Sequence, residues 1–445
     1  MSDFSPHGDL VELIQQLIRN RCVNDGSVSS GEEHRNTALL ESFLESSGLP
    51  IERHTSAPGR DNLVARIEGS DPKAPSLLLM GHTDVVPVNA RRWRNDPFGG
   101  ELIGDEVWGR GAIDMFNLTA SMAYAMRELA RAGFKPKGSL IYAAVADEEA
   151  GGTYGAEHLL KTIPDTVRAD YVITESGGFP LPGADGTKLP VLVAEKGINW
   201  SRLRITGTPG HGSMPFRTDN ALVKAAEVVR RINQYTPATR IHESWRTFVS
   251  SMGLPEELTK PLVTEEGFVE AIAGLPLGLS RMAYSCAHTT ITPTVMQAGA
   301  KLNIIPDTVE VELDVRTLPG DGPAEVAAMI DEALGDLAAD VEFLPGKEHG
   351  ATVSPMDTPL WDTLARVSTR FYADSSIIPL LMVGATDARF FRSAGSVCYG
   401  FGMFSRKLTL DDLAQMGHGD DERVDLESLG MISDLWDAVA RDLLV

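Results

Sequence analysis

The chain has 445 residues with the composition of a globular protein, since 43% of its residues are hydrophobic and 23% are charged. This composition excludes disorder throughout, and the length is sufficient for about two or three domains. Asp and Glu number 62 against 40 for Lys and Arg, which gives a formal net charge of −22 at pH 7. Because a surface this negative repels polyanions, we expect neither nucleic acid nor an anionic membrane as a partner.

The cysteines and the first residues indicate the compartment. Cys22, Cys286 and Cys398 lie far apart and form no Cys-x-x-Cys pair. They therefore indicate neither a disulfide framework nor a thiolate zinc site. The first residues are acidic and lack the apolar run of a signal peptide, and no stretch of the sequence is typical of a membrane span. We therefore expect a cytoplasmic protein.

Helix and strand patterns alternate from the start of the chain. An apolar pattern at helical spacing covers 10–18, and Ser30 with Glu33 is typical of a capping box that begins a second helix, which ends at Gly48. Strands are predicted at 62–67, 76–80, 140–146 and 171–174, and further helices at 118–132 and 154–161. Strands that alternate with helices favour an α/β sandwich built on a mostly parallel sheet.

The middle of the chain differs, because apolar and polar residues alternate there as they do in half-exposed strands. Two such strands and two helices are predicted, at 198–206, 309–317, 221–232 and 324–337. After Pro345 the buried α/β pattern returns. We therefore predict one α/β domain, residues 1–196 and 345–445, that is interrupted by an inserted α+β domain, residues 197–344.

Imidazole and carboxylate side chains follow three of the predicted strands. His82 and Asp84 come after the strand at 76–80, Glu148 and Glu149 after the strand at 140–146, and Glu175 after the strand at 171–174. Because open α/β sheets bind ligands beyond the carboxyl ends of their strands, we expect these side chains to meet at one edge. Imidazole and carboxylate ligands without thiolate suit zinc, manganese or cobalt, and a cation would relieve the repulsion among the carboxylates.

The spacing of these residues indicates separate roles. His82 and Asp84 are two residues apart and point the same way on an extended backbone, so the carboxylate can orient the ring. Glu148 and Glu149 are adjacent and point in different directions, so one can bind a metal while the other acts as a general base. Asp114 adds a carboxylate after a Gly-Arg-Gly turn. Any one of these acids could instead be a helix cap or a solvated loop residue, but their joint position at strand ends favours a metal site.

Eight short motifs occur in order along nearly the whole chain. They are Gly-His-Thr-Asp-Val-Val-Pro (81–87), Trp-Gly-Arg-Gly-Ala-Ile-Asp-Met (108–115), Asp-Glu-Glu-Ala-Gly-Gly (147–152), Gly-His-Gly-Ser (210–213), Lys-Leu-Asn-Ile-Ile-Pro (301–306), Val-Arg-Thr-Leu-Pro-Gly (315–320), Gly-Ala-Thr-Asp-Ala-Arg (384–389) and Gly-His-Gly-Asp-Asp-Glu-Arg (417–423). Together they resemble the di-zinc metallopeptidase family of aminoacylase, carboxypeptidase G, carnosinase and succinyl-diaminopimelate desuccinylase. Ala194-Glu195-Lys196-Gly197, before the insertion, most resembles the branch of carboxypeptidase S and the N-acyl-amino-acid hydrolases.

The resemblance implies two divalent metal ions per chain and a ligand set for each. His82 and Glu175 would bind one metal, and Glu149 and His418 the other. Asp114 would bridge both. The implied metal is zinc, with manganese and cobalt as alternatives.

The resemblance also implies catalytic and substrate-binding residues. Glu148 would be the general base, and Asp84 would be the partner of His82. The inserted domain would be a lid and dimerisation domain of a homodimer, from which His211 would reach the neighbouring protomer's active site and stabilise the oxyanion. Four further positions match residues that hold substrate in relatives: Asn303, Arg316, Thr386 and Arg389.

The sequence therefore predicts a metal-dependent hydrolase that cleaves the amide bond of a small substrate, either an N-acyl amino acid or a dipeptide. Phe116 and Asn117 depart from the family pattern, which usually has Lys after Asp114-Met115. An alternative hypothesis is therefore a changed pocket that accepts a non-peptide amide or an amine-bearing ring. A hypothesis of another class is an inactive metal-binding scaffold or regulatory protein, against which the presence of Glu148 argues.

Overall fold

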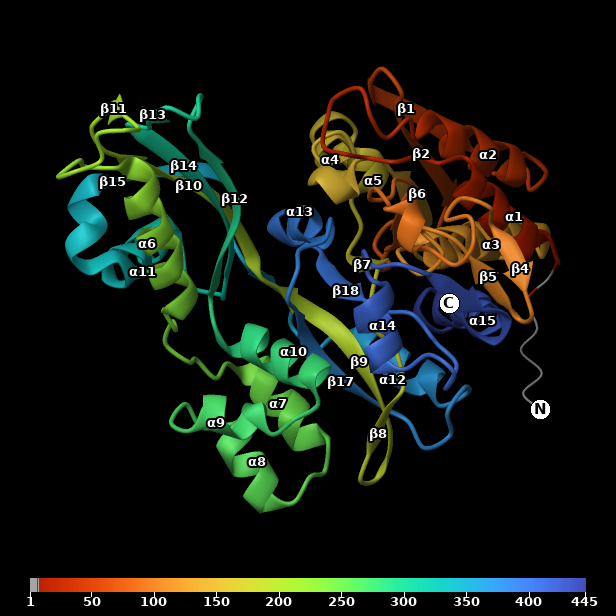
Figure 1. The fold of residues 1–445 in the computed structure, drawn as a ribbon. Coiled ribbons are helices and arrows are strands. Elements are labelled where there is room, and N and C mark those ends of the chain that lie inside the picture. The colour runs from red at the N-terminus through yellow and green to blue at the C-terminus, as the bar shows by residue number, and fades with distance from the viewer. Residues whose placement is uncertain (1–5, 7) are drawn as a thin grey trace.

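One large sheet runs through the larger part of the molecule in the computed structural model, which describes residues 8–445 together with residue 6 (Figure 1). Its strands are β1 (Ile51–Ala57), β2 (Arg60–Ile67), β3 (Leu77–His82), β6 (Leu140–Val145), β7 (Tyr171–Thr174), β8 (Leu181–Gly183), β9 (Gly186–Glu195), β16 (Thr352–Val353), β17 (Ser376–Met382) and β18 (Val397–Gly400). The order is β1-β2-β6-β3-β7-β18-β9-β16, and β17 and β8 also pair with β9. The central pairs β6–β3, β3–β7 and β7–β18 are parallel, whereas β1–β2 and β2–β6 are antiparallel. The predicted α/β class is confirmed, with a sheet that is parallel at its centre and mixed overall.

Helices cover both faces of this sheet. One face carries α1 (Gly8–Arg19), α2 (His34–Glu45), α3 (Phe116–Arg131), α12 (Pro359–Ser368) and α15 (Leu426–Leu443), and the other carries α4 (Ala156–Thr162), α5 (Pro164–Val167) and α13 (Ala388–Ser393). Alternate residues of β3 enter the two cores, because Leu77 and Leu79 pack on the first face and Leu78 and Met80 on the second. A strand that is buried on both faces is a continuous apolar run in the sequence, which explains why the pattern predicts β3 and β6.

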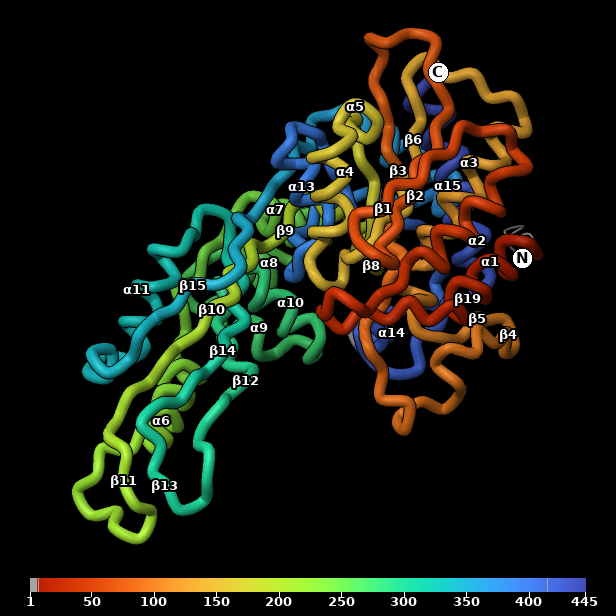
Figure 2. The backbone as a smooth tube through the Cα atoms, turned by 90° about the horizontal axis from the view of Figure 1, so that it is seen from above, coloured from red at the N-terminus to blue at the C-terminus, as the bar shows by residue number. Residues whose placement is uncertain are grey.

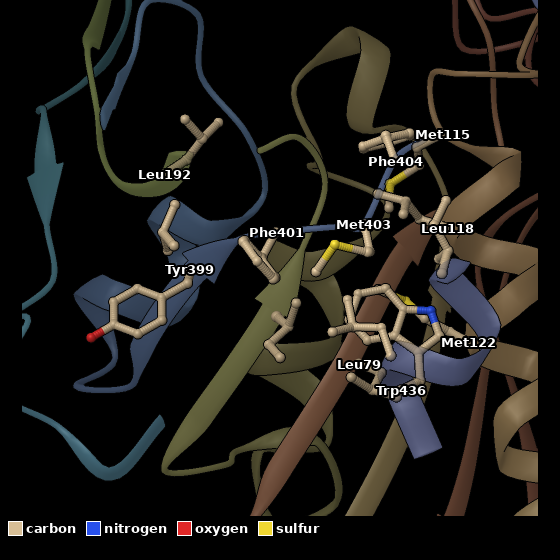
Figure 3. Close-up of a cluster of buried hydrophobic side chains, with 14 of the residues drawn as sticks. Leu79, Met115, Leu118, Met122, Leu192, Tyr399, Phe401, Met403, Phe404 and Trp436 are labelled. Carbon is tan, nitrogen blue, oxygen red and sulfur yellow. The ribbon is translucent and has the colours of Figure 1, made fainter. Parts of the chain in front are cut away.

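The first of these cores extends to the carboxyl end of β3 (Figure 3). Trp436 of α15 is fully buried and donates a hydrogen bond from Nε1 to Ser121 Oγ of α3 at 3.0 Å. Figure 3 shows Trp436 with Leu79 of β3, and Met115 farther along the same cluster. The Sδ atom of Met115 accepts a hydrogen bond from the backbone N–H of His82 at 3.3 Å. The core therefore fixes the backbone at the point where β3 ends.

A second, four-stranded sheet belongs to a small lobe, which extends away from the larger part (Figures 1 and 2). The elements of this lobe are β10 (Gly197–Thr206), β11 (Gly210–His211), α6 (Ala221–Gln234), β12 (Thr290–Ala298), β13 (Ile304–Ile305), β14 (Thr308–Thr317), α11 (Pro323–Leu334), η3 (Gly335–Asp340) and β15 (Val341–His349). Its strands pair antiparallel in the order β12-β14-β10-β15. Leu203 and Ile205 of β10 share a core with Val228 of α6 and Ile330 of α11. One face of this sheet is thus covered by helices, as the alternating pattern at 198–206 predicts.

The residues between α6 and β12 pack elsewhere. They form α7 (Glu243–Ser251), α8 (Glu256–Leu262), α9 (Phe268–Ala273) and α10 (Leu277–Ala287). Trp245, Phe248 and Phe268 are buried in the first core of the larger part. Trp245 stacks on Phe248 with ring centroids 5.4 Å apart and donates from Nε1 to the Leu262 carbonyl oxygen at 2.8 Å. Part of the predicted insertion, 197–344, is therefore packed into the larger part, and the domain boundaries themselves stay a prediction.

Lys196 ties together two places where the chain crosses between the two parts. It joins β9 to β10 and is almost completely buried. Its Nζ donates to the carbonyl oxygen of His288 at 2.8 Å and to Thr290 Oγ1 at 3.2 Å, where α10 leads into β12. Desolvation lowers the pKa of the Lys196 ammonium to about 7.

The predicted capping box at Ser30 and Glu33 is wrong. Helix α2 begins at His34, and the side chain of Glu33 makes no cap hydrogen bond. Glu33 is instead fully buried and forms an ion pair with Arg60, which is also buried. The Ser30 hydroxyl donates to Asn24 Oδ1 at 3.2 Å. The ion pair with Arg60 on strand β2 therefore determines the position of Glu33, and the local capping pattern does not.

A small sheet brings together two segments that are far apart in the sequence. It consists of β4 (Glu101–Ile103), β5 (Glu106–Trp108) and β19 (Arg423–Asp425), and α14 (Leu410–Met416) precedes β19. Arg423 pairs with Trp108, and the Gly109 N–H donates to the Glu422 carbonyl oxygen at 2.9 Å. This pairing sets the turn before Asp114 beside the segment that contains His418. Among the described helices, none is long and apolar enough to cross a lipid bilayer.

Truncation of Trp245 tests whether the helices α7–α10 are anchored in the larger part. Trp245→Ala should lower the free energy of unfolding by about 3–5 kcal/mol, the usual cost of deleting a buried aromatic side chain. Urea denaturation measures the change. Leu258→Ala, which truncates an exposed residue of α8, is the matched control and should change stability by less than about 0.5 kcal/mol. Equal effects of the two variants would contradict the anchoring role of Trp245.

Candidate metal centre

Three parallel strands deliver the predicted ligands to one edge of the large sheet. His82 is the last residue of β3, Glu149 lies in the short turn η2 (Glu148–Ala150) that follows β6, and Glu175 directly follows β7. Asp114 comes from the turn before α3, and His418 from the segment after α14. The structure therefore brings together all five residues that the sequence predicts as metal ligands.

These residues form two groups that share one carboxylate. Ligand atoms of His82, Asp114 and Glu175 lie within 4.8 Å of one another, and so do those of Asp114, Glu149 and His418. Asp114 Oδ1 is 3.2 Å from His82 Nε2, and its Oδ2 is 3.4 Å from His418 Nε2. His418 Nε2 is also 3.1 Å from Glu149 Oε2. Asp114 thus faces both groups, as a bridging ligand would.

Asp84 fixes the orientation of the His82 ring through its backbone. His82 Nδ1 donates to the Asp84 carbonyl oxygen at 3.0 Å, which leaves Nε2 facing Asp114. The Asp84 carboxylate lies farther away, with Oδ1 3.6 Å from Nδ1. Its Oδ2 instead accepts from Asn24 Nδ2 at 2.8 Å and from the Glu149 N–H at 3.2 Å. Asp84, the predicted partner of His82, therefore contacts the ring through its main chain, whereas its carboxylate contacts the loop that carries Glu149.

Glu422 is a buried residue that the sequence analysis does not single out, although it lies within the motif 417–423. Its Oε1 accepts from the backbone N–H groups of Ile113 at 2.8 Å and Asp114 at 3.0 Å. Arg110 Nη1 donates to Glu422 Oε2 at 2.7 Å and compensates its charge. Glu422 therefore holds the backbone that presents the shared carboxylate.

Two residues of the site adopt a backbone conformation that is uncommon outside glycine. Asp147, which precedes the pair Glu148 and Glu149, has φ 67°, and His418 has φ 55°. Polar contacts hold Asp147 in place, because its Oδ1 accepts from Asn24 at 3.2 Å and its Oδ2 from the Tyr154 N–H at 3.0 Å. Such outliers commonly occur at functional sites, where surrounding contacts maintain them.

The protonation equilibria of the site reflect an excess of buried negative charge. Desolvation raises the pKa values of Glu148 and Glu175 well above the usual range, and the charge of Glu175 adds to the shift at Glu148, as the charge of Asp114 does at Glu175. Burial alone would lower the pKa of His82, but the Asp114 hydrogen bond and the charge of Glu175 raise it. Hydrogen bonds to Asp114 and Glu149 raise the pKa of His418 to about 10. The excess negative charge thus stabilises the protonated forms of these carboxyl and imidazole groups.

The donor set fits a pair of divalent cations. Each group combines carboxylate oxygen with one imidazole nitrogen and contains no thiolate, which is the set expected for zinc, manganese or cobalt. Two cations would also neutralise carboxylates that otherwise repel one another. Glu148 belongs to neither group in the described chain, so its carboxylate is left for another role.

Thr386 and Arg389 lie close together beside the loop that carries Glu149. Arg389 is buried, and its Nη1 donates to the Thr386 carbonyl oxygen at 2.5 Å. Its Nε and Nη2 have no hydrogen-bond partner among the described residues. The Thr386 hydroxyl donates to Glu195 Oε2 at 3.1 Å. Arg389 therefore has two buried donors that make no hydrogen bond, and its Nη2 lies 4.0 Å from Asp387 Oδ1.

Lys347 is a second cation at this loop that no motif indicates. It comes from β15 of the small lobe, and its Nζ donates to the carbonyl oxygens of Ala150 at 3.2 Å and Gly151 at 3.4 Å. Desolvation and then the charge of Arg389 lower the pKa of Lys347, so the two cations are neighbours. The sequence offers only an isolated lysine here, so nothing in it could have identified this residue.

The remaining predicted residues lie in the small lobe, away from the ligand groups. His211 in β11 and Asn303 beside β13 are exposed at the far tip of this lobe (Figures 1 and 2). His211 Nδ1 is 2.7 Å from Ser213 Oγ. Arg316 of β14 pairs with Asp314 at 2.7 Å and stacks over Trp200. Within one chain, the structure does not bring these three residues to the metal ligands.

Comparisons with known proteins place these features in context. The model of peptidase family M20/M25/M40 matches residues 78–442. A probable carboxypeptidase S-like 2 of Dictyostelium discoideum is 26% identical over 84% of this chain and 73% of the relative. An N-fatty-acyl-amino acid synthase/hydrolase of Xenopus tropicalis is 27% identical over 95% and 83%. The crystal structure of the metallo-carboxypeptidase Sso-CP2 from Sulfolobus solfataricus has a TM-score of 0.73 at 16% identity, covering 98% of this chain and 99% of that one.

Removal of the Asp114 side chain tests the shared position. Because its carboxylate faces both groups, Asp114→Ala should lower the metal content well below that of the wild type and abolish activity at the same time. Emission spectrometry of dialysed protein measures the metal. Asp105→Ala, which removes an exposed carboxylate paired with Lys407, should retain full metal content. A folded Asp114→Ala protein with undiminished metal would show that Asp114 does not bridge.

Proposed function

Because the chain belongs to peptidase family M20/M25/M40, we propose that it hydrolyses the amide bond of an N-acyl amino acid or a dipeptide at a two-metal site. The family and the relatives make it a hydrolase of carbon–nitrogen bonds that uses divalent metal. The observation that supports the two-metal site is the pair of ligand groups that share Asp114. The name of the Xenopus relative, which acts on N-fatty-acyl amino acids, further supports an acylated amino acid as the substrate.

In this proposal each metal has its own residues. His82 and Glu175 hold the first, Glu149 and His418 the second, and Asp114 both. Zinc suits the imidazole and carboxylate donors, and manganese and cobalt are alternatives. When bound, the cations would activate a water molecule at neutral pH and polarise the scissile carbonyl.

Glu148 is the proposed general base. It is next to Glu149, is half-buried, and belongs to neither ligand group in the described chain. Desolvation and the charge of Glu175 raise its pKa, which suits a carboxyl group that must both take up and release a proton. Glu148 would accept the proton of the attacking water and transfer it to the leaving nitrogen.

Arg389 is the proposed binding partner of a substrate carboxylate. It is buried, and Nε and Nη2, which make no hydrogen bond and of which Nη2 lies 4.0 Å from Asp387 Oδ1, form the fork that recognises a carboxylate in a bidentate manner. Lys347 adds a second positive charge at the same loop. Thr386 is held by Glu195 and supports the Arg389 position. Arg316 of the small lobe remains the alternative carboxylate partner.

A homodimer formed through the small lobe is part of the proposal. Large apolar side chains are exposed on this lobe, where contact with a second chain would bury them; they are Met214, Phe216, Leu222, Val223, Val295, Met296, Leu302 and Ile304. His211 lies at the tip of the lobe among several of these residues. It would donate a hydrogen bond to the oxyanion in the neighbouring protomer's site, and Asn303 would bind substrate beside it.

Two further observations bear on the hypotheses left by the sequence. Phe116 and Asn117 are buried inside α3 rather than exposed to the site, so their departure from the family pattern gives no support to a changed substrate pocket. Cys22, Cys286 and Cys398 are buried and unpaired, which supports the proposed location in the reducing cytoplasm.

Replacement of Glu148 by glutamine tests the base. Gln keeps the size of Glu but cannot accept a proton, so Glu148→Gln should lower kcat on an N-acyl amino acid by at least ~10²-fold. Metal content should stay at the wild-type level, because Glu148 is not a proposed ligand. Glu157→Gln, at a position paired with Lys161 on α4, is the matched control. Near-normal turnover by Glu148→Gln would exclude the assignment.

Mixed dimers test the proposed role of His211. His211→Ala should lower kcat by ~10²–10³-fold, the usual effect of losing one oxyanion donor, without loss of metal. If His211 acts across the dimer, mixing this variant with Glu148→Gln should restore part of the activity, because one site of each mixed dimer then has both groups intact. Mixed dimers that form, as native mass spectrometry would show, but stay inactive would contradict action across the interface.

A further inference from the structure

The segment that precedes helix α2 brings a buried amide side chain to the ligand-bearing edge of the large sheet. Asn24 lies in this segment and is only 3% exposed. Its backbone N–H donates to the carbonyl oxygen of Val85 at 2.8 Å, just beyond the end of β3. Val23 also pairs with Val85 in a parallel bridge. The segment therefore runs beside the continuation of β3 and places the Asn24 side chain next to the residues that follow this strand.

The amide group of Asn24 bridges two buried carboxylates. Its Nδ2 donates to Asp84 Oδ2 at 2.8 Å and to Asp147 Oδ1 at 3.2 Å. Asp84 follows β3 and Asp147 follows β6, and these two strands are parallel neighbours in the sheet. Because an amide NH2 group has two hydrogens, both donors of Asn24 are used. A neutral group thus holds together two negative groups that would otherwise repel each other.

The two bridged residues in turn hold the candidate metal centre. The Asp84 carbonyl oxygen accepts from His82 Nδ1 at 3.0 Å, and Asp84 Oδ2 accepts from the Glu149 N–H at 3.2 Å. Asp147 directly precedes the proposed base Glu148 and has a backbone φ of 67°, which its side-chain contacts must maintain. The bridging amide therefore acts on one ligand of each group and on the turn that carries the base.

The oxygen end of the same amide is fixed by three donors. Asn24 Oδ1 accepts from the Gly26 N–H at 3.0 Å, from the Ser30 hydroxyl at 3.2 Å and from Arg60 Nη2 at 3.4 Å. Arg60 is itself fixed by its ion pair with the buried Glu33. Rotation of the amide by half a turn would lose these donors and set its oxygen against two carboxylates. The surrounding contacts therefore keep Nδ2 turned toward the site.

We propose that Asn24 is a positioning residue of the hydrolytic site, whose amide keeps the turn with the proposed base in a fixed position relative to His82. The inference rests on the proposed function and adds to it a residue that no motif indicates. Asn24 belongs to neither ligand group of the described chain, so it acts through Asp84 and Asp147. The family model matches the chain from residue 78 onward, so this position lies outside the matched residues.

Two substitutions test the proposal in kinetic measurements on the metal-loaded enzyme. Asn24→Ala removes both donors, and Asn24→Asp replaces the amide by a carboxylate of the same size. Because a small displacement of reacting groups costs up to about 10²-fold in rate, kcat on an N-acyl amino acid should fall ~10-fold or more in both variants. KM should stay near the wild-type value, because Asn24 does not contact the substrate. Asn220→Asp makes the same chemical change at the N-cap of α6, where the side chain accepts a hydrogen bond, and should leave both constants unchanged.

Zinc binding gives a readout that does not depend on turnover. Groups that hold the ligand residues from outside usually contribute about 10–100-fold to metal affinity. Competition with a chromophoric chelator should therefore show at least ~10-fold weaker zinc binding to Asn24→Ala than to the wild type or to Asn220→Asp. Asn24→Ser keeps one donor and should weaken zinc binding less than Asn24→Ala does. It also provides the measurement if the alanine variant does not fold.

These measurements keep the inference separate from the proposed function. If the metal-loaded wild-type protein hydrolyses neither N-acyl amino acids nor dipeptides, the proposed function fails, and zinc affinity alone decides on the positioning role. The inference is overturned if the folded variants bind zinc as tightly as the wild type or keep its kcat. A rise in KM with unchanged kcat would also overturn it, because Asn24 would then contact the substrate instead of positioning the turn.

Discussion

Mutual repulsion among buried carboxylates at the ends of β3, β6 and β7 is the constraint on which the rest of the structure depends. Each carboxylate is brought there by a strand or turn that the core holds in place, so none can move away from its neighbours. Histidines on both sides of Asp114 carry part of the compensating charge. A further ring of paired groups, Glu33 with Arg60 and Glu422 with Arg110, supports the loops. Divalent cations would complete this balance, which is why the donor set indicates a metal enzyme.

The sequence predicts the ligand-bearing edge of the sheet well, for a simple physical reason. Strands buried on both faces are continuous apolar runs, and a polar residue directly after such a run can only lie at the sheet edge. His82, Glu149 and Glu175 were found in this way. Asp114 and His418 lie in loops. Asp114 is indicated by its position after a Gly-Arg-Gly turn, and His418 only by the motif that carries the family resemblance.

Other features could not be predicted because they depend on tertiary contacts. The pattern of Ser30 and Glu33 is that of a helix cap, but Glu33 forms an ion pair with the buried Arg60 instead. An orienting carbonyl such as that of Asp84 leaves no trace in residue identity. Lys347 is an ordinary lysine until β15 brings it to the ligand loop. An apolar helix pattern likewise does not tell which of two cores the helix joins.

The packing of α7–α10 has a consequence for the modularity of this fold. An inserted domain whose residues all pack outside the parent domain could be removed or exchanged as one unit. Here Trp245, Phe248 and Phe268, which lie inside the predicted insertion, are part of the core of the larger part, and Met282 of α10 lines an apolar cavity beside Asp114 and Glu175. Excision of 197–344 would expose that core and dismantle the cavity. Exchange of the small lobe alone would therefore need junctions on both sides of α7–α10, because this helical segment divides the lobe into two separate stretches of the chain.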